Sequence, residues 1–151
     1  MMRTIPTITV VDDDQAVCNS LRFSLALDGF DVRTYFAPSQ LLSEWNLADQ
    51  GCLVLDFRLP EMTGLQLLKR LREREVLLPA IIMTTNPSSN LREEVQDAGA
   101  GLVEKPLLGD TLLYTIRSSL RMQEPDGSRR SHQRTDCGCN KAKRRRIREF
   151  I

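Results

Sequence analysis

The stretch from Gly51 to Gly64, GCLVLDFRLPEMTG, constrains the fold of this chain more than any other. Within it, the apolar run of residues 52–55 ends abruptly at a single acidic residue, Asp56. A short continuous apolar run that is bounded by turn residues is typical of a strand buried on both faces, as in a parallel sheet. Pro60 and Gly64 then indicate a loop before a helix. The pattern predicts that Asp56 lies at the carboxyl end of a central strand, where open α/β sheets bind their ligands.

Further strands and helices are predicted on both sides of this stretch. Apolar or alternating runs predict strands, over residues 7–11, 31–36, 79–84 and 102–104. Apolar residues three or four positions apart predict helices, over residues 15–27, 39–45, 65–75, 91–98 and 108–122. Five strands that alternate with five helices indicate an α/β domain in which helices cover both faces of a parallel sheet.

The charge of the chain changes sign along its 151 residues. Residues 1–120 carry 11 Lys/Arg and 16 Asp/Glu, a net charge of −5, whereas residues 121–151 carry 10 and 4, a net charge of +6. The length suffices for one domain with a core and a modest appendage. We therefore expect an acidic domain over residues 1–122 and a basic, flexible tail over residues 123–151.

No part of the sequence indicates a membrane segment or a secretory signal. The apolar stretches are shorter than the roughly 18 residues that a membrane-spanning helix needs, and three aspartates follow closely after the first residues. Cys18 and Cys52 fall in a predicted helix and a predicted strand, where a free cysteine behaves as a small apolar residue. We expect a cytoplasmic protein without a membrane partner.

Polar side chains follow four of the predicted strands at the point where each strand ends. They are Asp12 with Asp13, Asp56, Thr84 and Lys105. Because the carboxyl ends of parallel strands meet at one edge of the sheet, these side chains are expected to lie close together. Mg²⁺ takes oxygen ligands from carboxylates, lysine supplies a point charge for a phosphoryl group, and an aspartate can form an acyl phosphate. The set predicts a Mg²⁺-dependent phosphoryl-transfer site with an aspartate as acceptor.

Four motifs resemble the receiver domain of bacterial two-component response regulators. They are VVDDD at residues 10–14, VLDFRLPEMTG at 54–64, IIMTT at 81–85 and VEKP at 103–106. The resemblance covers residues 5–122, with the motifs in the family's order. It implies a doubly wound, five-stranded parallel sheet of the flavodoxin-like (CheY-like) kind, with strand order 2-1-3-4-5. It also implies a sensor histidine kinase as partner, and many relatives continue into a helix-turn-helix output domain.

The resemblance implies a role for each acidic residue of the site. Asp56 matches the phosphoacceptor. Asp12 and Asp13 match the acidic pair that holds Mg²⁺, and Asp56 together with the main-chain carbonyl of Arg58 completes the protein ligands. Asp14 is expected to cap the following helix instead, because aspartate favours that position.

The resemblance also implies a switch. Thr84, rather than its neighbour Thr85, matches the hydroxyl that moves toward the phosphoryl oxygens, and Lys105 matches the lysine that pairs with the phosphate. The Lys105–Pro106 bond resembles the family's cis peptide. Receivers usually carry an aromatic residue three positions before the lysine, and here Leu102 is either a changed switch or an ordinary surface leucine. The last two helices are a candidate homodimer surface.

The basic tail leaves two interpretations open. KAKRRRIRE at residues 141–149 is either a solvated charged run or a weak, nonspecific nucleic-acid contact. His132, Cys137 and Cys139 lack the fourth ligand and the spacing of a zinc site. The residues after Met122 are too few and too polar for a helix-turn-helix domain. The protein is thus expected to be a stand-alone receiver, or a regulator whose output part is truncated or reduced to the tail.

Three classes of function compete. A phosphorylation-controlled switch without substrate turnover accounts for the whole site, so we do not expect an enzyme. A hydrolase of the haloacid dehalogenase type needs a second acid two residues after its nucleophile, and Arg58 occupies that position. A nucleic-acid-binding protein would act through the tail.

Overall fold

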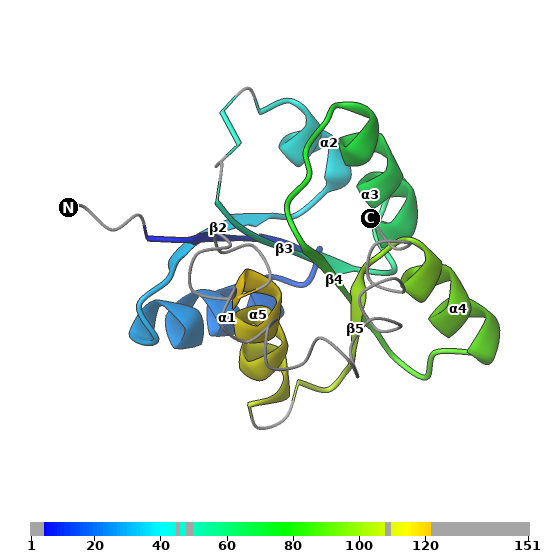
Figure 1. Cartoon of the computed structure of the whole chain (residues 1–151). Coiled ribbons are helices and arrows are strands. Elements are labelled where there is room, and N and C mark those ends of the chain that lie inside the picture. The colour runs from blue at the N-terminus through cyan, green and yellow to red at the C-terminus, as the bar shows by residue number, and fades with distance from the viewer. Residues whose placement is uncertain (1–4, 45, 48–49, 108–109, 122–151) are drawn as a thin grey trace, which may run out of the picture.

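In the computed structural model, which describes residues 5–44, 46–47, 50–107 and 110–121, a five-stranded parallel sheet lies between two layers of helices (Figure 1). The strands are β1 (Thr7–Val11), β2 (Asp31–Tyr35), β3 (Gly51–Asp56), β4 (Ala80–Thr84) and β5 (Gly101–Glu104). The helices are α1 (Gln15–Leu27), α2 (Pro38–Leu42), α3 (Gly64–Glu73), α4 (Ser89–Asp97) and α5 (Thr111–Arg121). The strands pair in the order β2-β1-β3-β4-β5, so the predicted fold class and strand order are confirmed.

The three central strands are buried on both faces, and their side chains alternate between two cores. Val54 of β3 packs with α1 and α5, whereas Leu53 and Leu55 pack with α2, α3 and α4. Figure 1 shows the same division, with α1 and α5 on one face of the sheet and the other three helices on the opposite face. Because β3 is apolar on both faces, the only position at which it can carry an ionised side chain is its end, which is where Asp56 lies.

Capping residues fix the start of α1 and α3 beside the carboxyl edge of the sheet. Asp14 caps α1 as predicted, because its Oδ1 accepts the N–H groups of Ala16 at 2.9 Å and Val17 at 3.4 Å. Thr63 and Gln66 form a capping box at the start of α3, where each side chain accepts the main-chain N–H of the other residue. Both helices therefore begin directly above the residues that end β1 and β3.

Helices α2 and α5 differ most from their predicted bounds. Helix α2 ends at Leu42 rather than at residue 45, because Arg74, the residue that follows α3, donates a hydrogen bond to the Leu42 carbonyl at 2.6 Å and the chain leaves the helix there. Residue 45 itself lies outside the described residues. Helix α5 begins at Thr111 rather than at residue 108, after Asp110, whose carbonyl accepts the N–H of Tyr114 at 2.8 Å.

Helix α3 also ends earlier than predicted, at Glu73 rather than at residue 75. Glu75 has a left-handed backbone with φ of 65°, and the N–H of Val76 turns back to the Leu71 carbonyl at 3.0 Å. This closure is the Schellman type of helix end. In the described part of the chain, no helix combines the length and the apolar character needed to cross a membrane. Residues 122–151 lie outside the described residues, so the predicted division into a domain and a tail stays a prediction.

Candidate functional site

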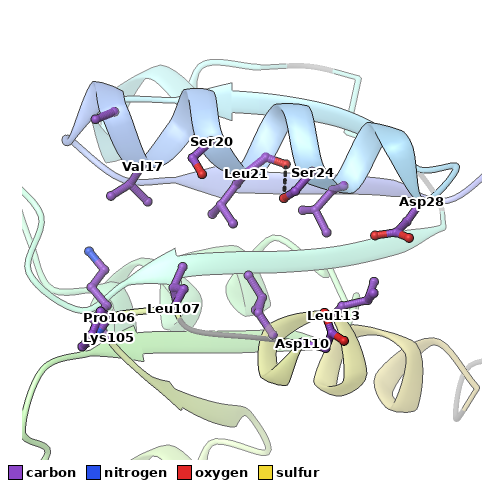
Figure 2. A pocket seen from close by; sticks show the side chains of 13 residues that line it. Val17, Ser20, Leu21, Ser24, Asp28, Lys105, Pro106, Leu107, Asp110 and Leu113 are labelled. Atoms are coloured by element: carbon purple, nitrogen blue, oxygen red, sulfur yellow. Dashed lines mark hydrogen bonds between the residues drawn. The ribbon is translucent and has the colours of Figure 1, made fainter.

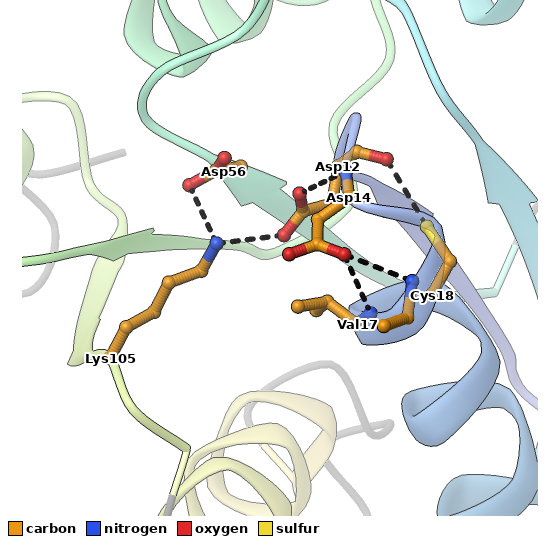
Figure 3. Close-up of polar contacts among 7 residues, drawn as sticks. Asp12, Asp14, Val17, Cys18, Asp56 and Lys105 are labelled. Carbon is orange, nitrogen blue, oxygen red and sulfur yellow. Dashed lines mark hydrogen bonds and ion pairs between the residues drawn. The ribbon is translucent and has the colours of Figure 1, made fainter.

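The sheet brings four of the predicted site residues together at its carboxyl edge. Figure 3 shows three of them, Asp12, Asp56 and Lys105. Asp12 and Asp13 follow β1, Asp56 is the last residue of β3, and Lys105 follows β5. Carboxylate oxygens of the three aspartates lie within 4.8 Å of one another. The Lys105 Nζ lies 2.9 Å from Asp12 Oδ2 and 3.3 Å from Asp56 Oδ1. One ammonium group thus links two of three clustered carboxylates.

Asp12 is the most firmly held of the three acids, because each of its polar groups has a partner. Its side chain is 0 % exposed, its Oδ1 accepts the main-chain N–H of Asp14 at 2.9 Å, and its Oδ2 accepts Lys105 Nζ. The thiol of Cys18 donates to its carbonyl at 3.2 Å. Asp13, by contrast, is exposed, whereas Asp56 is 7 % exposed. The cluster is therefore rigid at Asp12 and open to solvent at Asp13.

Burial and mutual repulsion perturb the titration of the cluster. Burial, and then the charge of Asp12, raises the pKa of Asp56 above its usual range, although Lys105 opposes this shift. Burial by itself would lower the pKa of Lys105, but its hydrogen bond to Asp12 and the charges of Asp12 and Asp56 prevail and raise that pKa. The lysine consequently stays charged, while ionised Asp56 is under electrostatic stress that a bound cation would relieve.

The donor set fits Mg²⁺. Its members are carboxylate oxygens, the hard ligands that Mg²⁺ prefers, and the open side at Asp13 leaves room for the water molecules that this ion retains. Arg58, whose main-chain carbonyl is the fourth predicted ligand, lies in the loop after β3 and forms an antiparallel bridge with Thr63. These residues are the ones that would hold the ion.

Thr84 and Thr85 differ sharply in their surroundings. Thr84 ends β4 and is 4 % exposed, and its carbonyl accepts the N–H of Lys105 at 2.8 Å. Thr85 is exposed. The Lys105–Pro106 peptide bond is cis. Leu102 is half-buried and packs against the core that contains α4, so it is a packing residue rather than an exposed leucine of the surface.

Two contacts near the site involve residues for which the sequence predicts no polar role. Cys18, interpreted from the sequence as a small apolar residue, donates to Asp12, and burial followed by the charge of Asp12 raises the pKa of its thiol to about 11. Glu61, in the loop after Asp56, accepts two hydrogen bonds from Ser39. In the sequence, the contact between Cys18 and Asp12 is indicated only by the position of Cys18 in the first turn of the helix that follows the acidic end of β1. Nothing in the sequence indicates the contact between Glu61 and Ser39.

A groove of about 480 Å³ lies between α1 and α5, beside the acidic cluster (Figure 2). Val17 and Leu21 form one wall, and Leu107 and Leu113 face them from the other side. Lys105 lies at one end of the groove. A molecule bound there would lie next to the carboxylate cluster.

Known proteins share both the sequence pattern and the fold. The family described as the response regulator receiver domain matches residues 8–117. The chain is 38 % identical over 122 residues to the C4-dicarboxylate transport transcriptional regulatory protein DctR of Rhodobacter capsulatus, with 78 % of this chain and 61 % of DctR covered. It is 36 % identical over 125 residues to the transcriptional regulatory protein FixJ of Bradyrhizobium diazoefficiens, with 82 % and 61 % covered. The chain thus spans less than two thirds of the length of these relatives.

Solved structures share the fold. The crystal structure of FixJ-N has a TM-score of 0.71 at 29 % identity, with 79 % of this chain and 96 % of that chain covered. The chemotaxis response regulator CheY4 of Vibrio cholerae has a TM-score of 0.70 at 27 % identity, with 78 % and 100 % covered. The match therefore covers nearly the whole of the FixJ-N and CheY4 structures.

Proposed function

Because the chain belongs to the response regulator receiver family of two-component systems, we propose that it accepts a phosphoryl group from a sensor histidine kinase on Asp56 in a Mg²⁺-dependent reaction. The observation that carries the proposal is the convergence of three carboxylates and Lys105 at one edge of the sheet. Such a set provides a nucleophile, ligands for a divalent cation and a fixed positive charge, which are the parts that phosphoryl transfer requires.

Each residue of the cluster has a distinct part in the transfer. An oxygen of the Asp56 carboxylate forms the new bond to phosphorus as the bond to the donor nitrogen breaks. Lys105 would pair with the phosphoryl oxygens, while Asp12 and Asp13, with Asp56 and the Arg58 carbonyl, would hold Mg²⁺. The ion supplies positive charge that neutralises the transferred group. No further substrate is consumed, so the protein is a phosphoacceptor and not a turnover enzyme.

The new phosphoryl group would act on the residues that follow β4. Thr84 is buried at the end of that strand, and its carbonyl accepts the N–H of Lys105, so a main-chain hydrogen bond joins the two residues that we propose as phosphate contacts. We infer that a hydrogen bond from the Thr84 hydroxyl to the phosphoryl group biases the loop before α4. The altered surface, formed by α4 and α5, is the one we propose for homodimerisation.

Labelling of the wild-type protein tests this function directly. Incubated with radiolabelled acetyl phosphate, the protein should become labelled in the presence of Mg²⁺ and stay unlabelled when EDTA removes the ion. The label should be released by hydroxylamine, as expected of an acyl phosphate, and should map to the peptide that contains Asp56. Labelling that is independent of Mg²⁺, or sustained hydrolysis of a phosphate ester as in the haloacid dehalogenase type, would contradict the proposal.

A second candidate function concerns residues 123–151. Relatives of this chain are transcriptional regulators by name, and the residues from 121 onward carry a net charge of +6. We propose that phosphorylation in the cytoplasm is coupled to weak nucleic-acid binding by this segment, in which lysines and arginines neutralise phosphates.

The tail makes a separate prediction. In gel shifts, the full chain should bind duplex DNA weakly, with an affinity that falls steeply between about 50 and 200 mM salt. A protein that ends at residue 122 should lose this binding, because the remaining domain is acidic. Equal binding by both proteins would show that the segment is only a solvated charged run.

A further inference from the structure

We propose that Glu61 is a positioning residue for the metal and phosphoryl site, acting through the loop that joins Asp56 to α3. The inference rests on the proposed function, because it concerns how the chain holds one of the expected Mg²⁺ ligands, the Arg58 carbonyl. Glu61 does not belong to the acidic cluster itself. Its effect would be transmitted by the backbone of residues 57–63.

Both oxygens of the Glu61 carboxylate bind the same residue of another element. Oε1 accepts the main-chain N–H of Ser39 at 2.9 Å, and Oε2 accepts the hydroxyl of Ser39 at 2.9 Å. Ser39 lies in the first turn of α2, 22 positions earlier in the chain. A paired contact of this kind fixes the direction of the carboxylate as well as its distance, since two bonds must be satisfied together.

Helix α2 requires such a partner. The residue before the helix is Ala37, which has no side chain that can cap, so the N–H of Ser39 would otherwise lack a protein acceptor. A carboxylate at this end of a helix is also favourable electrostatically. The capping group of α2 is therefore supplied by the phosphoacceptor loop rather than by the helix's own flanking sequence.

The loop is otherwise fixed mainly at its base and on its inner side. The N–H of Gly64 donates to the Phe57 carbonyl at 2.8 Å, and Arg58 bridges to Thr63. Leu59 and Met62 pack against the core on the α2–α4 side. Among the residues that the structure describes, Glu61 makes the only side-chain hydrogen bonds between loop 57–63 and an element other than α3, whose first turn is capped by Thr63. Loss of the contact between Glu61 and Ser39 would free the outer edge of the loop. The peptide that carries the Arg58 carbonyl would then also be free to move.

Mg²⁺ affinity, measured by calorimetry on the unphosphorylated protein, tests the inference. We expect Glu61→Ala to raise the Kd for Mg²⁺ by about tenfold, the lower end of what lost supporting contacts cost a metal site. Ser39→Ala, which keeps every charge, should raise the Kd in the same direction by about threefold. Glu73→Ala, which removes an exposed carboxylate from the far end of α3, should leave the Kd unchanged.

A double variant separates positioning from mere capping of α2. Ala37→Ser supplies a side chain that can cap the helix without touching the loop. In the Glu61→Ala background it should restore the melting temperature while the Kd for Mg²⁺ stays high. Recovery of the Kd together with stability would overturn the inference, and so would an unchanged Kd in Ser39→Ala, because the effect of Glu61 would then be its charge alone. If wild-type protein itself bound no Mg²⁺, the proposed function would fail instead.

Discussion

An Asp56→Asn protein is expected to stay at background labelling with acetyl phosphate and Mg²⁺ under conditions in which the wild-type protein is fully labelled. An amide has no anionic oxygen that can attack phosphorus, and the two acids that remain in the cluster are those that we propose as Mg²⁺ ligands. Asp12 is buried and held by three contacts, and Asp13 is exposed at the open side. Asp97→Asn, which alters an exposed aspartate of α4, is the matched control and should be labelled like wild type. Comparable labelling of Asp56→Asn would place the acceptor elsewhere.

Asp56→Asn is also expected to change how the stability of the folded protein depends on pH. Since the pKa of Asp56 in the folded protein lies above its ordinary value of 3.8, ionised Asp56 destabilises the metal-free fold. This penalty is absent at pH values below 3.8 and complete once the pH exceeds the raised pKa. The free energy of unfolding of wild type should therefore fall relative to that of Asp56→Asn as the pH rises through this window. A difference that did not vary with pH would show that Asp56 is not under electrostatic stress.

Gly64→Ala is expected to destabilise the protein by about 3 kcal/mol, because the new methyl group would meet main-chain atoms that have no room to move. A Cβ at this position would lie 2.5 Å from the Asp56 carbonyl oxygen and 3.1 Å from the Asp56 carbonyl carbon. Helix α3 would have to withdraw from the end of β3. The melting temperature should fall by about 10 °C, and labelling of the remaining folded protein should slow because Asp56 is displaced.

Gly101→Ala is the matched control for this substitution. Its Cβ would have its nearest contact with the Thr115 Cγ2 at 3.4 Å, which is an ordinary van der Waals distance and involves a side chain. Thermal unfolding of the two variants side by side should show a change of less than about 1 kcal/mol for Gly101→Ala. Similar losses in both would mean that close approach of α3 to Asp56 is not the cause.

The sheet and the acidic cluster were predictable because their signals are local and strong. An apolar run that ends at Asp56 specifies a buried strand and its exit, and the same pattern repeats before Asp12 and Thr84. Parallel strands with helices between them then force these ends to one edge. The structure brings Asp12, Asp13, Asp56 and Lys105 together accordingly, whereas their chemical roles stay predictions.

The features that escaped prediction depend on contacts between distant parts of the chain. Helix α2 ends where Arg74, the residue after α3, donates a hydrogen bond to the Leu42 carbonyl 32 positions away, and the group that caps its start comes from Glu61. Neither the apolar periodicity of α2 nor its capping residues indicate the contact with Arg74 or the contact with Glu61. The start of α5 was misplaced for a simpler reason, since Leu108 extends the apolar stripe of that helix although Asp110 is a better helix-starting residue.

The edge strand β5 has a consequence for how the two sides of the molecule communicate. Helix α4 packs in the apolar layer on one side of the sheet and α5 in the layer on the other, so the central strands separate them completely. Strand β5 contacts both helices, and Arg92 of α4 is paired with Glu104 of β5 at 2.6 Å. The two helices of the α4–α5 surface thus meet at a single four-residue strand, and a displacement of this strand reaches both of them directly.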